Sequence, residues 1–234
     1  RVPGSQVSSP PRPEARPVRV PARPGPGRGG IGSVLLERGM DGFTVGQPSS
    51  FMSGEEWCQL YMEDCYVPKE NVLLGPGGFK KQIAGFNVER IGNASRSLAL
   101  GRHAYEVARE HALTRHQFGR ALCEFQGLQW KFADMALKLE SAQLLLYRAA
   151  ASADGGLPSP YETAIAKLAC NQAGFEVAND ALQVMGAYGY STEALVEYCV
   201  KRTRGWMIAG GSIEVLKNRV AEHVFDRRFS QRAS

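Results

Sequence analysis

The sequence predicts a mainly α-helical protein in which an antiparallel helical bundle follows the end of a β domain. Three observations support this fold class. Residues 31–75 contain short apolar runs separated by turn signals, and from about residue 80 the apolar spacing becomes helical. The long helices expected there are joined by short connections, which is typical of a bundle. We expect a disordered leader at residues 1–30, the end of the β domain at 31–78 and the bundle at 79–230.

The leader holds eight of the thirteen prolines and no leucine, isoleucine or aromatic residue. Such a segment buries too little apolar surface to offset the entropy of ordering it. It also carries six arginines against one acid, so it accounts for the formal net charge of +5. A nucleic-acid partner would depend on this leader alone, and we expect none. The GxGxxG match at residues 25–30 follows a Pro/Arg tract rather than a strand, so we expect no dinucleotide site there.

Three apolar runs predict strands in the next segment. Ile31–Leu36 is the first, Phe43–Val45 follows the turn signal at residues 39–42, and Trp57–Met62 is the third. So few strands rarely form an independent sheet. We therefore expect them to belong to a larger β unit whose beginning lies outside this chain.

Helical periodicity dominates the rest of the chain. Between Phe125 and Ala149 apolar residues recur at alternating three- and four-residue steps, which predicts one long helix with a single apolar stripe. Core packing is the expected role of every such stripe. The other expected helices span residues 83–112, 161–185, 192–204 and 212–227.

Cysteine usage and hydropathy exclude several classes of protein. The five cysteines are scattered and form no CxxC pair, which favours reduced thiols in the cytoplasm and argues against a disulfide framework or a metal site. No apolar run approaches the roughly 18 residues that span a bilayer, so we expect no membrane partner.

Three breaks between the predicted helices have residues suited to ligand binding. Thr114–Arg120 is basic and could bind a phosphate through arginine, or be a solvated turn. Gln183–Tyr190 is glycine-rich and could be an ordinary helix end or a close approach of backbone to a ligand. Ala209–Ser212 precedes the last helix and suits either an anion or a plain N-cap. The residues alone leave these alternatives open.

The order and spacing of these motifs resemble the acyl-CoA dehydrogenases. The segments that carry the resemblance are Leu60–Asp64, Asn71–Gly75, Arg115–Arg120, Phe125–Gln126, Gln183–Tyr190 and Gly210–Glu214. It covers residues 31–230 and implies a bundle of acyl-CoA dehydrogenase type. The implied protein binds FAD, oxidises an acyl-CoA to the trans-2-enoyl-CoA and passes electrons to an electron-transferring flavoprotein. It would also be a homo-oligomer, a dimer or a tetramer.

The same resemblance implies a set of FAD contacts. Arg115, Gln117 and Phe118 match positions that reach the FAD of a neighbouring subunit. The remaining implied contacts are Gln183 and Gly186, at the adenosine and pyrophosphate part of the cofactor, and Ser212 and Glu214, after the YEGT-type motif of the family.

The main departure from the family pattern is Gly210, which stands where most members carry their catalytic glutamate. The isovaleryl- and long-chain-type branch instead has its base on the first bundle helix, in a segment like F-x-x-E-R. This chain has that segment at residues 86–90, so the resemblance implies that Glu89 is the base. Phe86, Asn87, Arg90 and Gly210 would then lie near the substrate.

A carboxylate in a dry pocket, with a raised pKa, suits removal of the α-proton of a thioester. The alternative is an ordinary exposed glutamate beside an arginine. Three alternatives also stay open for the whole chain, which looks like the C-terminal portion of such an enzyme behind an unrelated leader. It is a truncated product of the enzyme gene, one half of a split flavoenzyme, or a non-catalytic bundle that only oligomerises.

Overall fold

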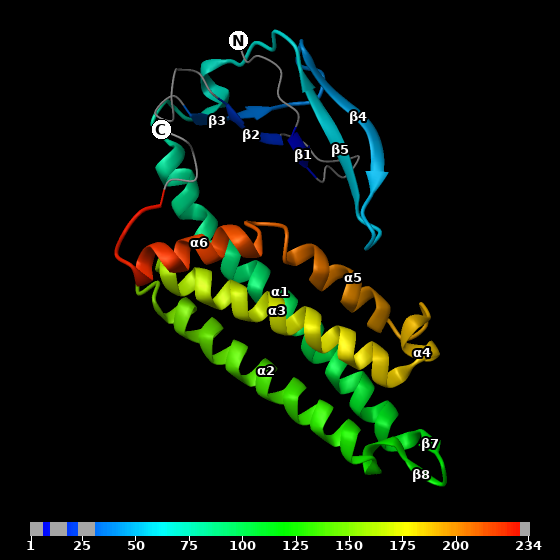
Figure 1. Cartoon of the computed structure of the whole chain (residues 1–234). Helices are drawn as coiled ribbons and strands as arrows, with labels where there is room; N and C mark the ends of the chain where they lie inside the picture. The colour runs from blue at the N-terminus through cyan, green and yellow to red at the C-terminus, as the bar shows by residue number, and fades with distance from the viewer. Residues whose placement is uncertain (1–6, 10–17, 23–30, 230–234) are drawn as a thin grey trace. The chain divides into compact units, whose positions relative to one another are not determined.

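The structure, a computed structural model, describes residues 7–9, 18–22 and 31–229 (Figure 1). The chain divides into two compact units after residue 84, within the first long helix. This division lies a few residues beyond the boundary expected at residue 78. Helices dominate the second unit and strands the first, as the sequence predicts.

The first unit contains two three-stranded antiparallel sheets, each with a short strand at one edge. The strand orders are β1 (Val7–Ser9), β5 (Glu56–Met62), β4 (Phe43–Ser50) and β2 (Val18–Ala22), β3 (Gly32–Leu36), β6 (Val72–Leu74), with a 3₁₀ helix at Lys69–Asn71 before β6. The three strands predicted from the sequence are confirmed as β3, β4 and β5. The register between β4 and β5 shifts between Val45 and Pro48, where proline has no N–H to donate.

The expectation of a disordered leader is wrong for residues 18–22. β2 pairs with β3 from Val18 opposite Leu36 to Ala22 opposite Gly32. Val20 is fully buried in a cluster with Leu36. Two valines spaced by one residue give the strand an apolar face, a local pattern that the overall composition of the leader conceals. Apart from β1, the other residues of the leader, including the GxGxxG match, lie outside the described residues.

The second unit is an antiparallel helical bundle, and the five predicted helices are confirmed with ends that differ by a few residues. Its elements are α1 (Phe79–Thr114, which begins in the first unit), β7 (His116–Gln117), β8 (Arg120–Ala121), a 3₁₀ helix at Leu122–Glu124, α2 (Gln126–Ala151), α3 (Pro160–Met185), α4 (Ala187–Tyr190), α5 (Val196–Trp206) and α6 (Ile213–Val224). Among the residues that the structure describes, no helix is long and apolar enough to cross a membrane.

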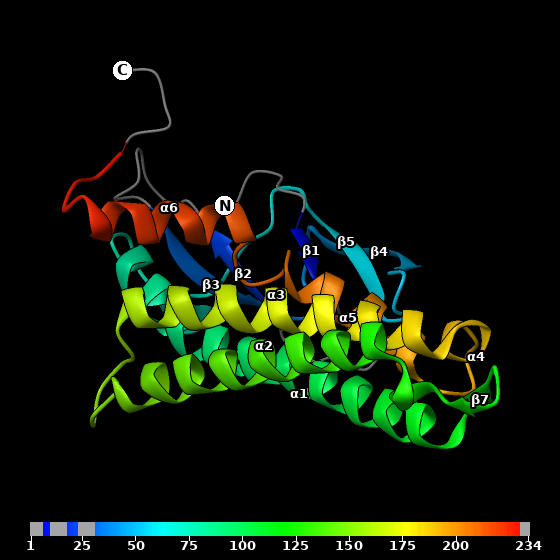
Figure 2. The same cartoon turned by 60° about the horizontal axis from the view of Figure 1, so that its bottom comes forward.

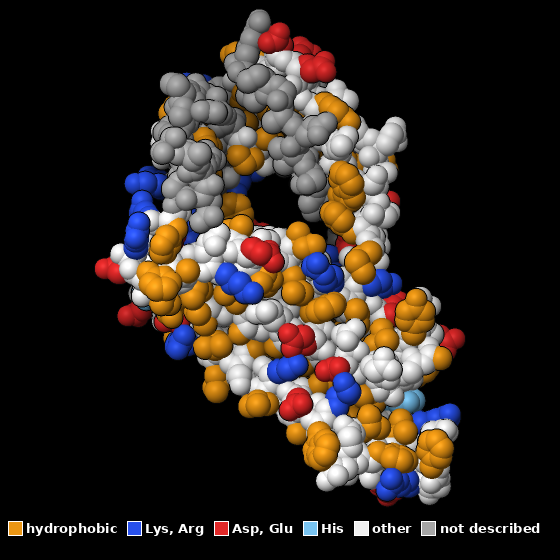
Figure 3. All heavy atoms as spheres, in the orientation of Figure 1, with side chains coloured by type: hydrophobic (Ala, Val, Ile, Leu, Met, Phe, Trp, Pro, Cys, Tyr) orange, Lys and Arg blue, Asp and Glu red, His pale blue; other side chains and the backbone are white. Residues whose placement is uncertain are grey.

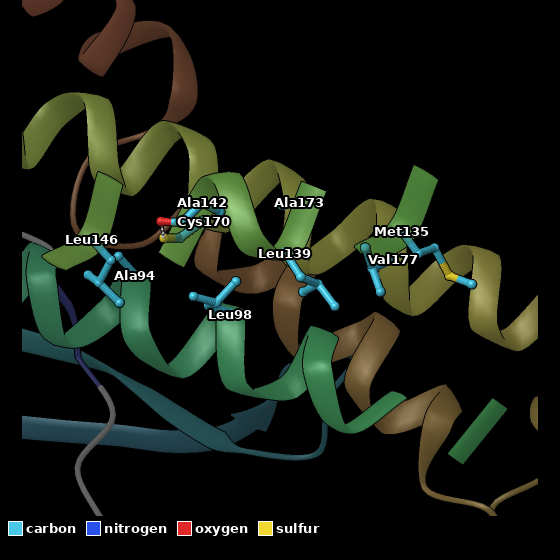
Figure 4. Close-up of a cluster of buried hydrophobic side chains, with 9 residues drawn as sticks. All are labelled: Ala94, Leu98, Met135, Leu139, Ala142, Leu146, Cys170, Ala173 and Val177. Carbon is cyan, nitrogen blue, oxygen red and sulfur yellow. Dashed lines mark hydrogen bonds between the residues drawn. The ribbon is translucent and has the colours of Figure 1, made fainter. Parts of the chain in front are cut away.

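α3 is the central helix of the bundle and contacts α2, α4, α5 and α6 (Figure 2). Its start is specified locally, because Ser159 caps it by accepting a hydrogen bond from the N–H of Glu162 and Pro160 occupies its first position. A core cluster joins Leu98 of α1, Leu139 of α2 and Val177 of α3 (Figure 4). The predicted apolar stripe of α2 is therefore buried as expected.

α1 and α3 approach each other backbone to backbone. A Cβ atom on Gly101 would lie 2.8 Å from the Cα of Gly174, a distance that real Cβ atoms do not adopt. The alanines that follow on both helices, such as Ala104 and Ala178, continue this close packing. The approach brings polar side chains of α1 and α3 within reach of the same turn, described next.

Candidate active site

The turn between α5 and α6 accepts hydrogen bonds from buried side chains of α3. Lys167 lies in the first half of α3, fully buried, and its Nζ donates to the carbonyl oxygens of Trp206 at 3.1 Å and Gly211 at 3.0 Å. Asn171, one helical turn later, donates to the same Trp206 oxygen at 2.6 Å. We call residues 206–211 the glycine turn.

α1 supports the middle of the glycine turn. Arg90 donates from Nε to the carbonyl oxygen of Gly210 at 3.1 Å, and Asn93 donates from Nδ2 to that of Ala209 at 3.3 Å. Asn171 also donates to Oδ1 of Asn93 at 3.1 Å, which links the two helices beneath the turn. Four carbonyls of the turn are thus satisfied by side chains from two helices.

Gly210 and Gly211 have backbone angles that favour glycine, with φ of +70° and +107°. A Cβ on Gly210 would meet only Nδ2 of Asn93 at 3.5 Å and Cε of Lys167 at 3.6 Å, which are ordinary contacts. A side chain at this position would therefore be opposed by backbone strain and not by lack of space.

Glu89 is exposed on α1, one residue before Arg90. Burial lowers the pKa of Lys167 and of Arg90, and the negative charge of Glu89 opposes this lowering, which places the carboxylate within electrostatic range of both cations. The described residues do not enclose it, so the dry pocket expected from the sequence is not formed by this part of the chain. Phe86, one helical turn before Arg90, is half-buried.

Asn87, which the resemblance places near the substrate, makes two hydrogen bonds within the chain. It is buried, its Nδ2 donates to the carbonyl oxygen of Pro158 at 3.2 Å, and its Oδ1 accepts from Nη1 of Arg90 at 3.2 Å. Both ends of the amide are occupied within the chain. Asn87 therefore orients Arg90, and Arg90 contacts the glycine turn.

Burial dominates the electrostatics of the two cations. It lowers the pKa of Lys167 to about 8, an effect that the positive charge of Arg90 increases and the charge of Glu89 opposes. Burial is also the main cause that lowers the pKa of Arg90, and the positive charge of Arg219 is the second. Two cations that have lost part of their hydration are thus held by backbone carbonyls and one nearby carboxylate.

Lys167 is not among the site residues predicted from the sequence. A signal was present, because Ala164 and Cys170, one turn before and after it on α3, are both buried. A lysine between two positions of a buried helical stripe is a charge on the core side of the helix.

Ser212 and Glu214 begin α6 directly after the glycine turn. The Oγ of Ser212 accepts from the N–H of Val215 at 3.5 Å, so the plain N-cap role considered for it is present. The pKa of Glu214 is lowered by its own backbone N–H and then by the hydroxyl of Ser212. The first turn of α6 therefore favours negative charge.

The β7–β8 hairpin ends in a two-residue loop formed by Phe118 and Gly119. Both residues have positive φ, +51° and +80°, as in a type I′ turn. The Phe118 side chain is 92% exposed, while Arg120 places its guanidinium 3.9 Å above the ring of Phe125. A large apolar residue that is both strained and exposed is uncommon, and such positions cluster at ligand contacts.

The other implied cofactor residues lie at the hairpin end of the bundle (Figures 1 and 2). Arg115, Gln117 and Gln183 are exposed there. Gly186 ends α3 with φ of +60°, so it has the ordinary helix-end role, and its N–H donates to the carbonyl oxygens of the last turn. The ring of Tyr188 in α4 stacks on that of His111 at 6.0 Å, which joins this corner to the end of α1.

The implied cofactor contacts therefore form two groups in this chain. One group surrounds the hairpin and α4, and the other begins α6. The 11 residues of α5 separate them, a length of about 16 Å at 1.5 Å per residue. The two groups therefore lie at opposite ends of α5.

α2 also exposes a second apolar stripe, opposite its buried one. The stripe, which we call the outer face of α2, consists of Trp130, Ala133, Leu137, Leu144 and Tyr147. The steps are of three or four residues, as at a helix–helix contact, except between Leu137 and Leu144, where the polar Ser141 interrupts the stripe. Figure 3 shows hydrophobic side chains along the edge of the bundle where α2 runs. This stripe is not among the features predicted from the sequence.

Comparisons with known proteins identify relatives of the chain. A family model described as "Acyl-CoA dehydrogenase, C-terminal domain" matches residues 76–225. The chain is 35% identical over 208 residues to a 3-sulfinopropanoyl-CoA desulfinase of Paraburkholderia xenovorans, covering 87% of this chain and 53% of that protein. It is 37% identical over 198 residues to the mitochondrial short-chain specific acyl-CoA dehydrogenase of Rattus norvegicus, covering 83% and 48%.

A solved structure gives the same result. Butyryl-CoA dehydrogenase from Megasphaera elsdenii is similar with a TM-score of 0.83 and 32% identity, covering 90% of this chain and 56% of that chain. The chain spans about half the length of the curated relatives it matches.

Proposed function

This chain belongs to the acyl-CoA dehydrogenase family, and from that premise we propose that it is the C-terminal part of an FAD-dependent acyl-CoA dehydrogenase whose base is Glu89. The proposed reaction converts an acyl-CoA thioester to the trans-2-enoyl-CoA. The observation that supports it is the attachment of α1 to the glycine turn through Arg90 and Gly210. This bond ties the helix that bears Glu89 to the position where most of the family carries its base.

The carboxylate of Glu89 takes the α-proton of the acyl group in this proposal. Proton removal needs a base held at one point, and α1 is fixed there by the hydrogen bonds of Arg90 and Asn93 to the glycine turn. Phe86 lies on the same face of α1 as Glu89, three residues earlier, and in this proposal it lines the part of the site that holds the acyl chain.

Bound FAD supplies the acceptor for the hydride that leaves the β-carbon. The residues present fit this cofactor. At the hairpin end, Arg115 offers a cation for the pyrophosphate and Phe118 an exposed ring, with Gln117, Gln183 and the backbone of Gly186 beside them. Because α5 separates this group from Ser212 and Glu214, we propose that each FAD is bound by residues of two subunits.

Oligomerisation is therefore part of the proposed site. The outer face of α2 is the surface that we assign to a second copy of the chain, in a dimer or a tetramer. An electron-transferring flavoprotein is the proposed acceptor of the electrons. The scattered cysteines without a CxxC pair are the basis for proposing a cytoplasmic location.

The test uses the purified full-length protein under anaerobic conditions. We expect it to retain FAD, and we expect butyryl-CoA to bleach the flavin absorbance as the cofactor is reduced. A protein that stays colourless and takes up no flavin would favour the non-catalytic bundle. Flavin binding only after addition of a second chain would favour the split enzyme.

A second candidate function is removal of the sulfinate group from 3-sulfinopropanoyl-CoA. It is favoured by Gly210, because a glycine abstracts no proton, and by the 35% identity to a desulfinase of that name. The two functions differ in their products. Sulfite release from 3-sulfinopropanoyl-CoA with no bleaching by butyryl-CoA would support the desulfinase, whereas bleaching by butyryl-CoA would support the dehydrogenase.

A further inference from the structure

We propose that Lys167 is a positioning residue that holds the glycine turn in the shape that the reaction at Glu89 requires. That a reaction takes place at Glu89 rests on the proposed function. That Lys167 holds the glycine turn rests on hydrogen bonds within the chain. Lys167 touches neither substrate nor cofactor in this proposal. It acts through the backbone of the turn.

One ammonium group fixes both ends of the turn. Lys167 donates to the carbonyl oxygen of Trp206, the last residue of α5, and to that of Gly211, one residue before the cap of α6. The segment between them contains Gly210, and two consecutive glycines with positive φ have little conformational preference of their own. The shape of the turn is therefore set by its partners.

The supports from α1 are weaker substitutes for Lys167. Arg90 and Asn93 each bind one carbonyl in the middle of the turn. Arg90 is only half-buried, whereas Lys167 is fully buried. A hydrogen bond made by a buried charged donor is stronger than one made in solvent. Without Lys167 the carbonyl of Trp206 would keep Asn171 as a donor, but the carbonyl of Gly211 would lose its side-chain partner and the two ends of the turn would no longer share one donor group.

A buried lysine is costly to keep, which is an argument for a specific role. Burial disfavours its charged form, and the only charged groups that act on it are Arg90 and Glu89 of α1 among the described residues. A methionine would fill the same volume without that cost. A neutral amine still carries two N–H donors, so both carbonyls stay satisfied on either side of its titration.

The test uses Trp206 as a reporter, because its own carbonyl accepts from Lys167. The chain has three tryptophans, and Trp57→Phe with Trp130→Phe leaves Trp206 alone. In this background we expect Lys167→Met to raise the acrylamide quenching constant of Trp206. The matched control is Lys138→Met, which removes a lysine paired with Glu176 at 2.7 Å on the bundle surface. We expect no change for the control.

The reaction is measured in the full-length protein with its own tryptophans. Lys167→Met should retain FAD and lower kcat by about 10²-fold with a smaller effect on KM, because a misplaced turn near the reacting atoms costs rate more than binding. Lys138→Met should keep wild-type kinetics. Quenching and kcat that match the control in both assays would overturn the proposal.

Two further measurements test the proposal even if Lys167→Met does not fold. Lys167→Gln keeps a neutral NH2 group with two N–H donors, but on a shorter side chain, and should give an intermediate quenching constant. In the wild-type chain, the N–H groups of Ile208 and Ala209, which bond to Gly205, should exchange with deuterium slowly. Exchange as fast as at the exposed hairpin loop would overturn the proposal. Wild-type activity of Glu89→Gln would refute the assignment of Glu89 as the base. If Lys167→Met still raises the quenching constant of Trp206 in that case, Lys167 holds the turn whichever residue is the base.

Discussion

Arg90 donates a hydrogen bond from Nε to the carbonyl oxygen of Gly210 across 3.1 Å. The two residues are 120 positions apart in the chain. Gly210 marks where most of the family has its catalytic glutamate, and Arg90 directly follows the glutamate that we propose in its place. The bond thus joins the two positions from which a base could reach one substrate carbon, because geometry and not sequence order decides that reach.

Gly210→Ala tests whether the glycine turn depends on its backbone angles. We expect it to lower the free energy of unfolding by about 1–2 kcal/mol, the cost of a left-handed conformation for a residue with a Cβ. Space is not limiting, since the added Cβ would make only ordinary contacts. Urea unfolding followed by circular dichroism measures the change.

The control for that prediction is Gly205→Ala, within α5, where a Cβ would meet nothing within 4 Å. It should be neutral or stabilise the chain by up to about 1 kcal/mol, because alanine has a higher helix propensity than glycine. Equal effects of the two substitutions would show that the turn is not strained at residue 210.

Arg115→Ala should weaken FAD binding. Loss of a charge-assisted contact to the pyrophosphate corresponds to about 1.5–3 kcal/mol, or roughly 10- to 150-fold in Kd. Lys at this position should restore only part of the affinity, because it lacks the planar guanidinium. The measurement is a flavin fluorescence titration of apoprotein.

Arg109→Ala is the matched control for Arg115, because Arg109 makes only a surface ion pair with Glu110 at 2.5 Å. Such exposed pairs contribute little. If both alanine variants bind FAD as the wild type does, Arg115 is an ordinary residue of a solvated turn.

The pKa of Lys167 predicts a pH dependence of stability. Its pKa is about 8 in the folded chain, against 10.5 for an ordinary lysine, because burial disfavours the charged form. Between these values the unfolded chain binds more protons, so this group makes the free energy of unfolding rise with pH. The destabilisation is complete below pH 8 and is relieved as pH approaches 10.5.

Buried thiols act in the opposite direction above pH 9. Burial raises the pKa of Cys170 to about 12 and that of Cys199 to about 11, so their protons are lost first from the unfolded chain. Comparison of wild type with Lys167→Met cancels this contribution. The difference in melting temperature, wild type minus variant, should become more positive from pH 8 to 10.5, and a constant difference would contradict the pKa assigned to Lys167.

Leu137→Glu should dissociate the oligomer. Leu137 lies at the middle of the outer face of α2, is 67% exposed in the isolated chain, and a charge there would be buried in an interface with a second copy. Light scattering should show a smaller particle than for the wild type. Ala150→Glu, on the same helix but outside that face, should leave the mass unchanged. A wild-type monomer at high concentration would contradict this assignment.

Local periodicity accounts for what could be predicted of the fold. The inner stripe of α2 was evident because its residues are spaced for one face, and Leu139 is indeed buried. The outer face of α2 was missed because apolar residues on two opposite faces of one helix occur in nearly every short segment of its sequence. The spacing of the second stripe is therefore hard to recognise. Val20 was missed because a strand of five residues is too short to outweigh the prolines around it.

The candidate site was predicted less completely, for a different reason. Glu89, Gly210 and Ser212 were identified from the order of the motifs along the chain. Motif order indicates which positions matter but not which groups they form hydrogen bonds with. Asn87 and Lys167 act through hydrogen bonds to carbonyls 71 and 44 residues away. A backbone carbonyl has no residue-specific sequence signal, so these contacts become visible only in the folded chain.

The central claim is that Glu89 is the catalytic base, and Glu89→Gln in the full-length protein tests it most directly. The substitution keeps the size of the side chain and its hydrogen bonding, so the fold and the bound FAD should be retained. The rate at which acyl-CoA bleaches the flavin is measured by stopped flow, with Glu106→Gln, another exposed glutamate of α1, as control. We expect Glu89→Gln to slow bleaching by about 10²–10⁴-fold, the contribution of a general base, and Glu106→Gln to behave as the wild type does. Bleaching by Glu89→Gln at the wild-type rate would contradict the assignment.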